Sequence, residues 1–261
     1  MFPFFRRSHH LFIASVSLFC LALVGMARAA SFQVNPIRIT LTPQGSSSLL
    51  AVRNDGTERL RLQVDFYAWN QSEQGEMILN PTDDLVVYPS LLTVDAGNER
   101  NVRVGTKSPL VSREKSYRVF LEELPPATKR VDSGIRILTR IGVPIFVQPQ
   151  NPNPQALIEK LAVHNSVIAF EVINRGNVHF LPRGIRVKGA DSTGANTLEK
   201  SLDPWYILAG GSRQYRLEIS PSDCSRIKDL TVEVELEEKN LKQQHSLSAN
   251  ASVDSRAVDA I

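Results

Sequence analysis

The chain has little cysteine and histidine, and this shortage excludes several kinds of site. Its 261 residues include two cysteines, Cys20 and Cys224, and five histidines. Because Cys20 lies in an N-terminal segment that we expect to be removed, no intramolecular disulfide is predicted for the mature chain. Cys224 has no histidine near it in sequence, which favours a structural role over a reactive thiol. The histidines show no metal-ligand spacing such as H-E-x-x-H, so no metal site is predicted.

The sequence also lacks the usual motifs of nucleotide-binding proteins and hydrolases. It contains no G-x-S-x-G, no Walker loop and no G-x-G-x-x-G. The adjacent carboxylates Asp83 and Asp84 would point to opposite faces of a strand, which makes them a poor acid–base pair. Trp69 and Trp205 fit a sandwich core or cleft better than a sugar-binding platform. We therefore expect no cofactor and no catalysed reaction, and an export-linked hydrolase is the weakest interpretation.

Residues 1–30 have the three parts of a secretory signal peptide. The basic residues Arg6 and Arg7 precede an apolar run, Leu11 to Val24, and a small-residue cleavage site that ends at Ala30. The run is shorter than the ~20 apolar residues that span a bilayer, so no stable membrane insertion is expected after removal. Cleavage lowers the formal net charge from +3 to zero. The basic excess belongs to the leader, and no nucleic-acid partner is predicted.

The mature chain divides into two β-rich parts at a proline-rich connector. Prolines at 149, 152 and 154 stiffen the segment 149–155, which we interpret as a hinge. Residues 31–148 and 156–238 are the predicted domains, and the polar stretch 239–261 is predicted to be a disordered tail. Short β-rich runs alternate with turn signals at roughly ten-residue spacing, which is typical of sandwiches. The sequence therefore predicts an all-β protein of two immunoglobulin-like β-sandwich domains, with no convincing helix.

The expected strands of the two domains are bounded by Gly, Pro, Asn and Asp residues. In the first domain they are 33–41, 47–53, 61–69, 91–94, 101–104, 117–122 and 135–147. In the second domain they are 157–164, 167–174, 184–188, 205–208, 214–219 and 230–236. Seven strands in the first domain is the number found in an immunoglobulin-like sandwich, although the Cys…Trp…Cys signature of antibody domains is absent.

The last strand of the first domain, 135–147, carries an unusually long apolar face. Alternate residues of a strand share a face, and here one face consists of Ile135, Ile137, Thr139, Ile141, Val143, Ile145 and Val147. On the other face, Pro144 lacks the backbone donor of a strand that is paired on both sides, which indicates an edge strand or a bulge. Proteins normally protect apolar edge strands, because such strands promote aggregation. An apolar edge strand that remains unprotected therefore suggests pairing with another polypeptide.

Several segments of the chain resemble the periplasmic chaperones of the chaperone–usher pathway. The first strand of that family is similar to residues 32–41, F-Q-V-N-P-I-R-I-T-L. Residues 87–104 are similar to a family segment in which a proline is followed by an apolar run, a turn and the residues V-R. Y-R-V-F-L-E-E-L-P-P at 117–126 is similar to the strand before the donor strand. F-E-V-I-N-R-G-N-V-H-F at 170–180 is similar to an element of the second domain.

This resemblance implies an L-shaped, periplasmic protein that binds fimbrial (pilin) subunits and delivers them to an outer-membrane usher. The family's donor strand completes the unfinished fold of the subunit, and the matching residues are Ile135, Ile137, Thr139 and Ile141, where Thr139 would meet a shallow pocket. The resemblance also implies two basic residues that anchor the subunit's terminal carboxylate. The first is Arg38, whose neighbours Ile37 and Ile39 are expected to point into the core. The second family position is Pro144 here.

Several alternatives to these assignments stay open at the level of the sequence. Arg140 is the nearest basic residue that shares the face of Pro144, but it lies ~13 Å along the strand; alternatively, the subunit end docks in a different way. The alternative for Arg38 is an ordinary solvated strand face without a binding role. The alternative for Ile141 to Val147 is that they pack in the domain's own core. Glu123 lacks the arginine with which the family bridges its domains, because Gln148 stands there. A secreted tandem adhesin or binding module is the competing function.

Overall fold

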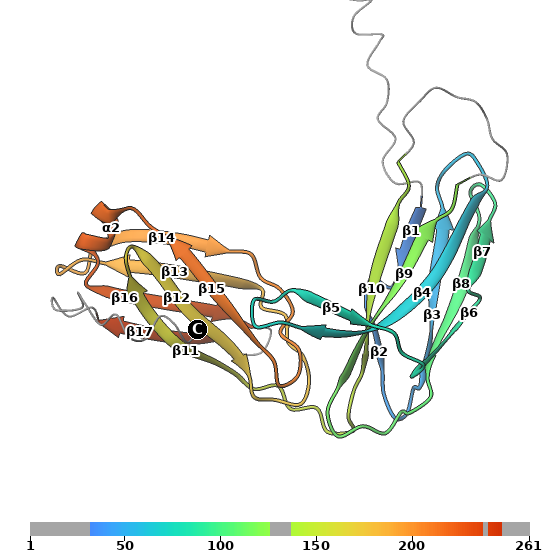
Figure 1. Ribbon diagram of the computed structural model, residues 1–261, viewed down its shortest axis with the longest axis horizontal. Coiled ribbons are helices and arrows are strands. Elements are labelled where there is room, and N and C mark those ends of the chain that lie inside the picture. Colours follow the sequence, from blue (N-terminus) through green and yellow to red (C-terminus); the bar gives the residue numbers. More distant parts are fainter. Residues whose placement is uncertain (1–31, 126–136, 237–239, 247–261) are drawn as a thin grey trace, which may run out of the picture.

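The computed structural model describes residues 32–125, 137–236 and 240–246 of the chain. Two β-sandwiches lie at an angle to each other and are joined at one end, so the molecule has the outline of an L (Figure 1). The prediction of two immunoglobulin-like sandwiches in an L-shaped arrangement is confirmed. The predicted leader, residues 1–30, lies outside the described residues. No helix within the described ranges is long and apolar enough to cross a membrane.

The first domain is built from two sheets that pack face to face. In one sheet the order is β1 (Phe32–Asn35), β3 (Ser47–Asn54), β8 (Glu99–Thr106) and β6 (Leu85–Tyr88). In the other the order is β2 (Ile39–Leu41), β10 (Arg140–Val147), β9 (Lys115–Glu123), β4 (Leu60–Gln71) and β5 (Met77–Asn80), and β7 (Leu91–Val94) also pairs with β4. Alternating apolar residues of both sheets, such as Val102 and Val104 of β8, point inward and form the core.

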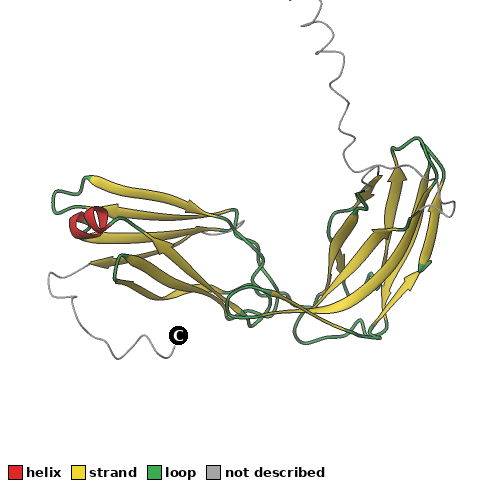
Figure 2. Ribbon diagram, turned by 45° about the horizontal axis from the view of Figure 1, so that its top comes forward, coloured by secondary structure: helices red, strands yellow, loops and turns green. Residues whose placement is uncertain are grey.

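The second domain is a smaller sandwich with its own core. One sheet has the order β11 (Ala156–His164), β12 (Val167–Asn174) and β15 (Ser212–Glu218). The other has the order β14 (Asn196–Leu202), β13 (Gly184–Ala190), β16 (Asp229–Glu235) and β17 (Asn240–Ser246). A short helix, α2 (Pro221–Arg226), lies at the end of this domain that is far from the first domain (Figures 1 and 2). Ser220 caps it by accepting the backbone N–H of Asp223.

Both domains contain the same buried asparagine turn. The side-chain amide of Asn54 donates to the carbonyls of Glu58 and Val94 at 2.8 and 2.9 Å, and its oxygen accepts the N–H of Gly56. Asn174 makes the equivalent three hydrogen bonds in the second domain. Each asparagine is 1% exposed. Buried amides that are fully hydrogen-bonded fix the loop around them, so this turn stabilises the same region of each sandwich.

The structure corrects several of the strand predictions. The expected strand 33–41 is broken at Pro36, so that β1 and β2 join different sheets, and Ile37 is 79% exposed instead of pointing into the core. Strands β5, β6 and β14 and helix α2 were not expected. Residues 205–208 are irregular apart from a bridge between Ile207 and Phe180. The predicted tail is wrong for 240–246, which form β17, because a polar segment adds to the open edge of β16.

Candidate functional site

Strand β10 forms an open edge of its sheet over the first half of its length. It pairs along its whole length with β9, but β2 pairs only with Ile145 to Val147. Strand β1 would be the natural neighbour of the first half, but it pairs with β3 in the other sheet. Within the described part of the chain, β10 from Arg140 to Pro144 therefore has a strand on one side only.

The backbone groups that face this open edge follow from the hydrogen-bond register. The N–H of Glu123 donates to the carbonyl of Thr139 at 2.9 Å, so odd-numbered residues of β10 turn their backbone groups toward β9. On the other side, the N–H of Gln148 donates to Leu41 at 2.8 Å. Even-numbered residues thus face the edge, and Pro144 loses no ladder bond by lacking an N–H. The backbone groups of Arg140 and Gly142 are the ones that an added strand would meet.

The apolar face of β10 changes from buried to exposed along the strand. Val143, Ile145 and Val147 are 0–1% exposed in the core, and Ile141 packs partly against it. Ile137, which precedes the strand, is 83% exposed. Thr139 is half-buried between these two regions, and Ile135 lies outside the described residues. One continuous row of side chains thus belongs to the domain core at one end and is presented to the surroundings at the other.

The opposite face of β10 contributes to the contact between the domains. Phe146 is fully buried in a cluster with Trp69 of the first domain and Leu208 of the second. His179 of the second domain stacks on Phe146 with 3.5 Å between ring centroids, and Tyr206 lies at 5.6 Å. The two faces of β10 therefore have separate roles, since one fills the core and the other holds the second domain.

A buried carboxylate ties the two domains together beside this cluster. The side chain of Glu114 is 0% exposed, and its Oε1 lies 2.7 Å from Nδ1 of His179 and accepts the N–H of His179 at 3.0 Å. Its Oε2 accepts from Nε2 of Gln148 at 3.2 Å. Gln148 thus pairs with Glu114 and not with Glu123. We did not single out Glu114 from the sequence, because nothing local marks a glutamate before a strand as buried.

The β4–β5 hairpin supplies a second connection, because it extends from the first sandwich to the second (Figure 1). The amide of Gln71 donates to the carbonyl of Tyr206 at 2.8 Å and accepts the N–H of Leu208 at 3.1 Å. The N–H of Gln214 donates to the carbonyl of Glu73 at 2.9 Å. These hydrogen bonds to backbone groups fix the angle between the two domains and so determine the shape of the space between them.

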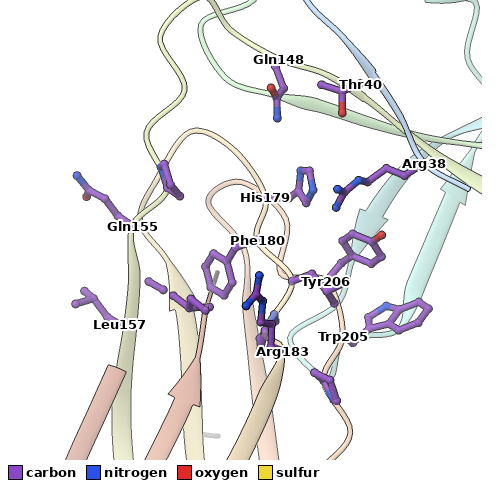
Figure 3. A pocket seen from close by; sticks show the side chains of 16 residues that line it. Arg38, Thr40, Gln148, Gln155, Leu157, His179, Phe180, Arg183, Trp205 and Tyr206 are labelled. Carbon is purple, nitrogen blue, oxygen red and sulfur yellow. The ribbon is translucent and has the colours of Figure 1, made fainter. Parts of the chain in front are cut away.

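A cleft of about 1100 Å³ opens between the domains. Figure 3 shows Arg38 pointing into it from the first domain, while His179, Arg183 and Tyr206 enter from the second. Its remaining walls are mainly apolar, proline and amide side chains, and no aspartate or glutamate is among the lining residues that the structure describes. The charge of Arg38 at this wall favours an anionic group.

The structure places the two predicted anchoring residues in different surroundings. Arg38 is exposed at the cleft and forms no ion pair or hydrogen bond with any residue of the described chain. Arg38 directly precedes Ile39, the first residue of β2, which pairs with Ile145 in the parallel register of β2 and β10. Arg140 lies further along β10, where its Nε is 3.3 Å from Glu122 and its guanidinium stacks over Phe120 at 4.1 Å. The fold therefore does not bring Arg140 to Arg38.

A third arginine, which we did not identify from the sequence, lies behind the cleft wall. Arg118 of β9 is 7% exposed and stands opposite Pro144 in the register. Its guanidinium lies 4.2 Å from the ring centroid of Trp69 and 5.7 Å from that of Trp205. Burial lowers the pKa of this guanidinium from its ordinary value, although an arginine stays protonated in such surroundings. In the sequence Arg118 is an ordinary polar position of an alternating strand.

The described residues contain no group of histidine, cysteine, aspartate and glutamate side chains that is arranged to hold a metal ion. For recognition of another polypeptide, the site offers an open row of backbone groups, an exposed apolar side chain at one end and a cleft with Arg38 at the other.

Comparison with known proteins finds one family model that matches the first domain. Residues 31–153 match the family model described as pili and flagellar-assembly chaperone, PapD N-terminal domain. No curated protein matches the chain.

Three solved structures show the same fold over most of the chain. The class 5 fimbriae chaperone CfaA is 19% identical and has a TM-score of 0.56, with 83% of this chain and 100% of that chain covered. The E. coli chaperone DraB is 16% identical with a TM-score of 0.53 and coverages of 84% and 100%. The SafB chaperone, solved in complex with the SafA pilin of Salmonella enterica, is 13% identical with a TM-score of 0.54 and coverages of 85% and 98%.

Proposed function

We propose that this chain, whose first domain matches the family model of pili and flagellar-assembly chaperones, binds fimbrial (pilin) subunits in the periplasm, caps them and delivers them to an outer-membrane usher. Binding occurs by donor-strand complementation, in which β10 lends a strand to an incomplete subunit. The chain needs no cofactor for this and catalyses no reaction.

The observation that carries the proposal is the open edge of β10 next to the exposed Ile137. An unpaired edge with apolar side chains normally promotes aggregation. Here the edge lies in a strand whose second half is firmly fixed by the core through Val143, Ile145 and Val147. A strand that is rigid at one end and open at the other is well suited to accept a partner strand without losing its own structure.

The partner would pair with the backbone groups of Arg140 and Gly142 and receive the alternating side chains of the row. We propose that Ile135, Ile137, Thr139 and Ile141 enter its groove. Each isoleucine that becomes buried contributes ~1.5–3 kcal/mol, which is reduced by the entropy lost on association. Several such side chains together with backbone hydrogen bonds give a stable complex that can still be exchanged for another strand.

The end of the open edge defines where the partner strand must stop. Strand β2 occupies the edge from Ile145 onward, so an added strand cannot continue past Pro144, and Arg38 directly precedes the first paired residue of β2. A strand parallel to β10 brings its carboxyl end to this point, whereas an antiparallel strand brings its amino end. The charge of Arg38 favours the carboxylate. We propose that Arg38 anchors the terminal carboxylate of the subunit.

The expected route of the protein agrees with this function. The predicted leader at 1–30 directs export, and removal of the leader leaves a protein with no excess of basic residues. We propose that the mature chain works in the periplasm, where subunits emerge unfolded and the usher receives them.

Copurification tests the proposal. The full chain carrying an affinity tag is produced together with an exported pilin from the same genome, and the captured proteins are identified by mass spectrometry. Wild type should retain the pilin, whereas Ile137→Asp should lose it while keeping its circular dichroism spectrum. Equal capture by Ile137→Asp would refute the donor role of this strand, and capture of a host-surface component instead of a pilin would favour an adhesin.

A further inference from the structure

Gly142 lies in the open part of β10, and the ring of Phe120 occupies the place where a side chain of residue 142 would be. A Cβ atom built on Gly142 would lie 2.8 Å from Cε1 of Phe120 and 3.6 Å from its Cζ. Gly142 and Phe120 are register partners in the antiparallel pair of β10 and β9. The backbone groups of Gly142 point away from β9, and the side chains of such a pair lie especially close together. The ring of Phe120 therefore reaches across β10 toward its open edge.

Two neighbours hold the ring of Phe120 in this orientation. The guanidinium carbon of Arg140 lies over the ring, 4.1 Å from its centroid, and Nε of Arg140 is 3.3 Å from a carboxylate oxygen of Glu122. The ring of Tyr67 meets that of Phe120 at 65°, with 6.0 Å between the centroids. Cation–π contacts and edge-to-face aromatic pairs both depend on ring orientation. The edge of the Phe120 ring at Gly142 is thus a defined contact surface.

The ring of Phe120 is an exception on its face of the sheet. The solvent-facing side of an antiparallel sheet usually carries polar residues, and the adjoining row, Arg140, Glu122 and Gln63, follows this pattern. The row of Gly142 carries Phe120 instead, and this residue is only half-buried. A half-buried ring beside an unpaired edge loses further apolar area to water when another strand covers that edge. The exception therefore concerns the strand that joins β10.

We propose that Phe120 is a specificity-determining residue for the partner strand: it contacts the partner residue that aligns with Gly142 and selects an apolar side chain at that one position. This inference rests on the proposed function and deepens it. The row that contains Ile137 and Ile141 contacts the partner from the opposite face of β10, so the partner strand is recognised on both of its faces. An apolar residue is thereby required at a partner position that would otherwise be polar and solvent-facing.

The register of the open edge explains why one partner position is selected. Residues that align on neighbouring strands place their side chains on the same face, about 5 Å apart, so the residue aligned with Gly142 meets the ring of Phe120. Two positions toward the hinge the partner aligns with Pro144, which is buried. Two positions the other way it aligns with Arg140, whose ion pair with Glu122 favours a polar neighbour. A charged or amide side chain at the middle position would lose water against a ring that offers it no comparable hydrogen bond.

The test compares synthetic peptides of alternating valine and threonine, in which no, one or two threonines are replaced by leucine. A short strand can slide along the edge until its leucine meets the ring, so the position need not be known in advance. On the full mature chain, one leucine should lower Kd about twofold to tenfold, as expected for an aromatic contact, and a second leucine should add little. Phe120→Leu should remove this preference. Tyr88→Leu, which changes a 74% exposed aromatic residue of the other sheet, should keep it.

The remaining arms separate the sources of failure. Phe120→Met keeps an apolar side chain of similar reach without the ring, and it serves if the leucine variant does not fold. Equal affinity of wild type for the peptides with and without leucine overturns the proposal, and so does a preference that persists in both Phe120 variants. A second leucine that adds as much affinity as the first overturns the assignment to one position. If no peptide binds wild type at all, the donor-strand function itself fails.

Photo-crosslinking provides a readout that needs no variant of the protein. A peptide that carries a photoactivatable leucine analogue at a central threonine position is irradiated on the wild-type chain, and the crosslinked residues are identified by mass spectrometry. Crosslinks should fall on Phe120 and on Gly142 and Arg140 beside it. The same analogue at a central valine position should instead mark Ile137 or Ile141 on the opposite face. Crosslinks from the threonine position that are confined to the isoleucine row contradict the proposal.

Discussion

Truncation of Ile137 separates binding from folding more cleanly than any other change in the molecule. The side chain is 83% exposed and precedes β10, so Ile137→Ala should change the free energy of unfolding by no more than ~0.5 kcal/mol. If the side chain enters a subunit groove, the same truncation removes most of a buried isoleucine from the complex. The expected loss is ~1.5–3 kcal/mol of binding free energy, which is about a tenfold to hundredfold increase in Kd.

The matched control is Val143→Ala, three alternate positions along the same face. Val143 is 1% exposed and belongs to the domain core, so its truncation should cost ~1–3 kcal/mol of stability. Its effect on Kd, measured under conditions where the variant is folded, should be small. Urea unfolding gives the stability, and titration of a denatured pilin with the chaperone gives Kd. If Ile137→Ala binds as tightly as wild type, or unfolds as easily as Val143→Ala, the division of β10 into a core half and a lending half is incorrect.

Three further predictions concern the surroundings of the site. Glu114→Ala should leave its hydrogen-bond partners unsatisfied at ~1–3 kcal/mol each and widen the distribution of domain angles; X-ray scattering that shows an unchanged profile would argue against this carboxylate as a domain tie. Gly142→Ala should lower the Tm, because a Cβ there lies 2.8 Å from the ring of Phe120, and an unchanged Tm would mean that the ring moves freely. Hydrogen bonding from Tyr117 lowers the pKa of Asp84 from 3.8 in the folded state, so this carboxylate contributes stability above about pH 4 that is lost on acidification. Tyr117→Phe should reduce that loss, and parallel unfolding curves down to about pH 2 for both proteins would contradict this assignment.

The sequence alone was sufficient for the fold class because the relevant signals are local. Alternation in β8 and β12 and turn residues such as Asn54-Asp55-Gly56 specify strands and turns without reference to distant residues. Prolines stiffen the hinge in the same local way. The apolar row from Ile135 to Val147 was also visible in the sequence.

The boundary between core and open edge was beyond the sequence, because it depends on which strand lies next to β10. Ile137 and Ile145 look alike in an alternating pattern, but β2 covers the edge only from Ile145, and the bend at Pro36 sends β1 to the other sheet. Burial of a strand residue is decided by its neighbours in the sheet, and those neighbours come from the opposite end of the domain.

The charged groups at the cleft show the same limit. Arg140 was only the nearest basic residue that shares the face of Pro144, and the structure places its side chain against Glu122 and Phe120. Arg118 and Glu114 gave no signal in the sequence, because their surroundings include Trp205 and His179 of the second domain. The sequence by itself determined the strands, the hinge and the apolar row, since these follow from local alternation and backbone stereochemistry. Tertiary structure decided which of these residues meet, since contacts across the hinge join positions that are far apart in the chain.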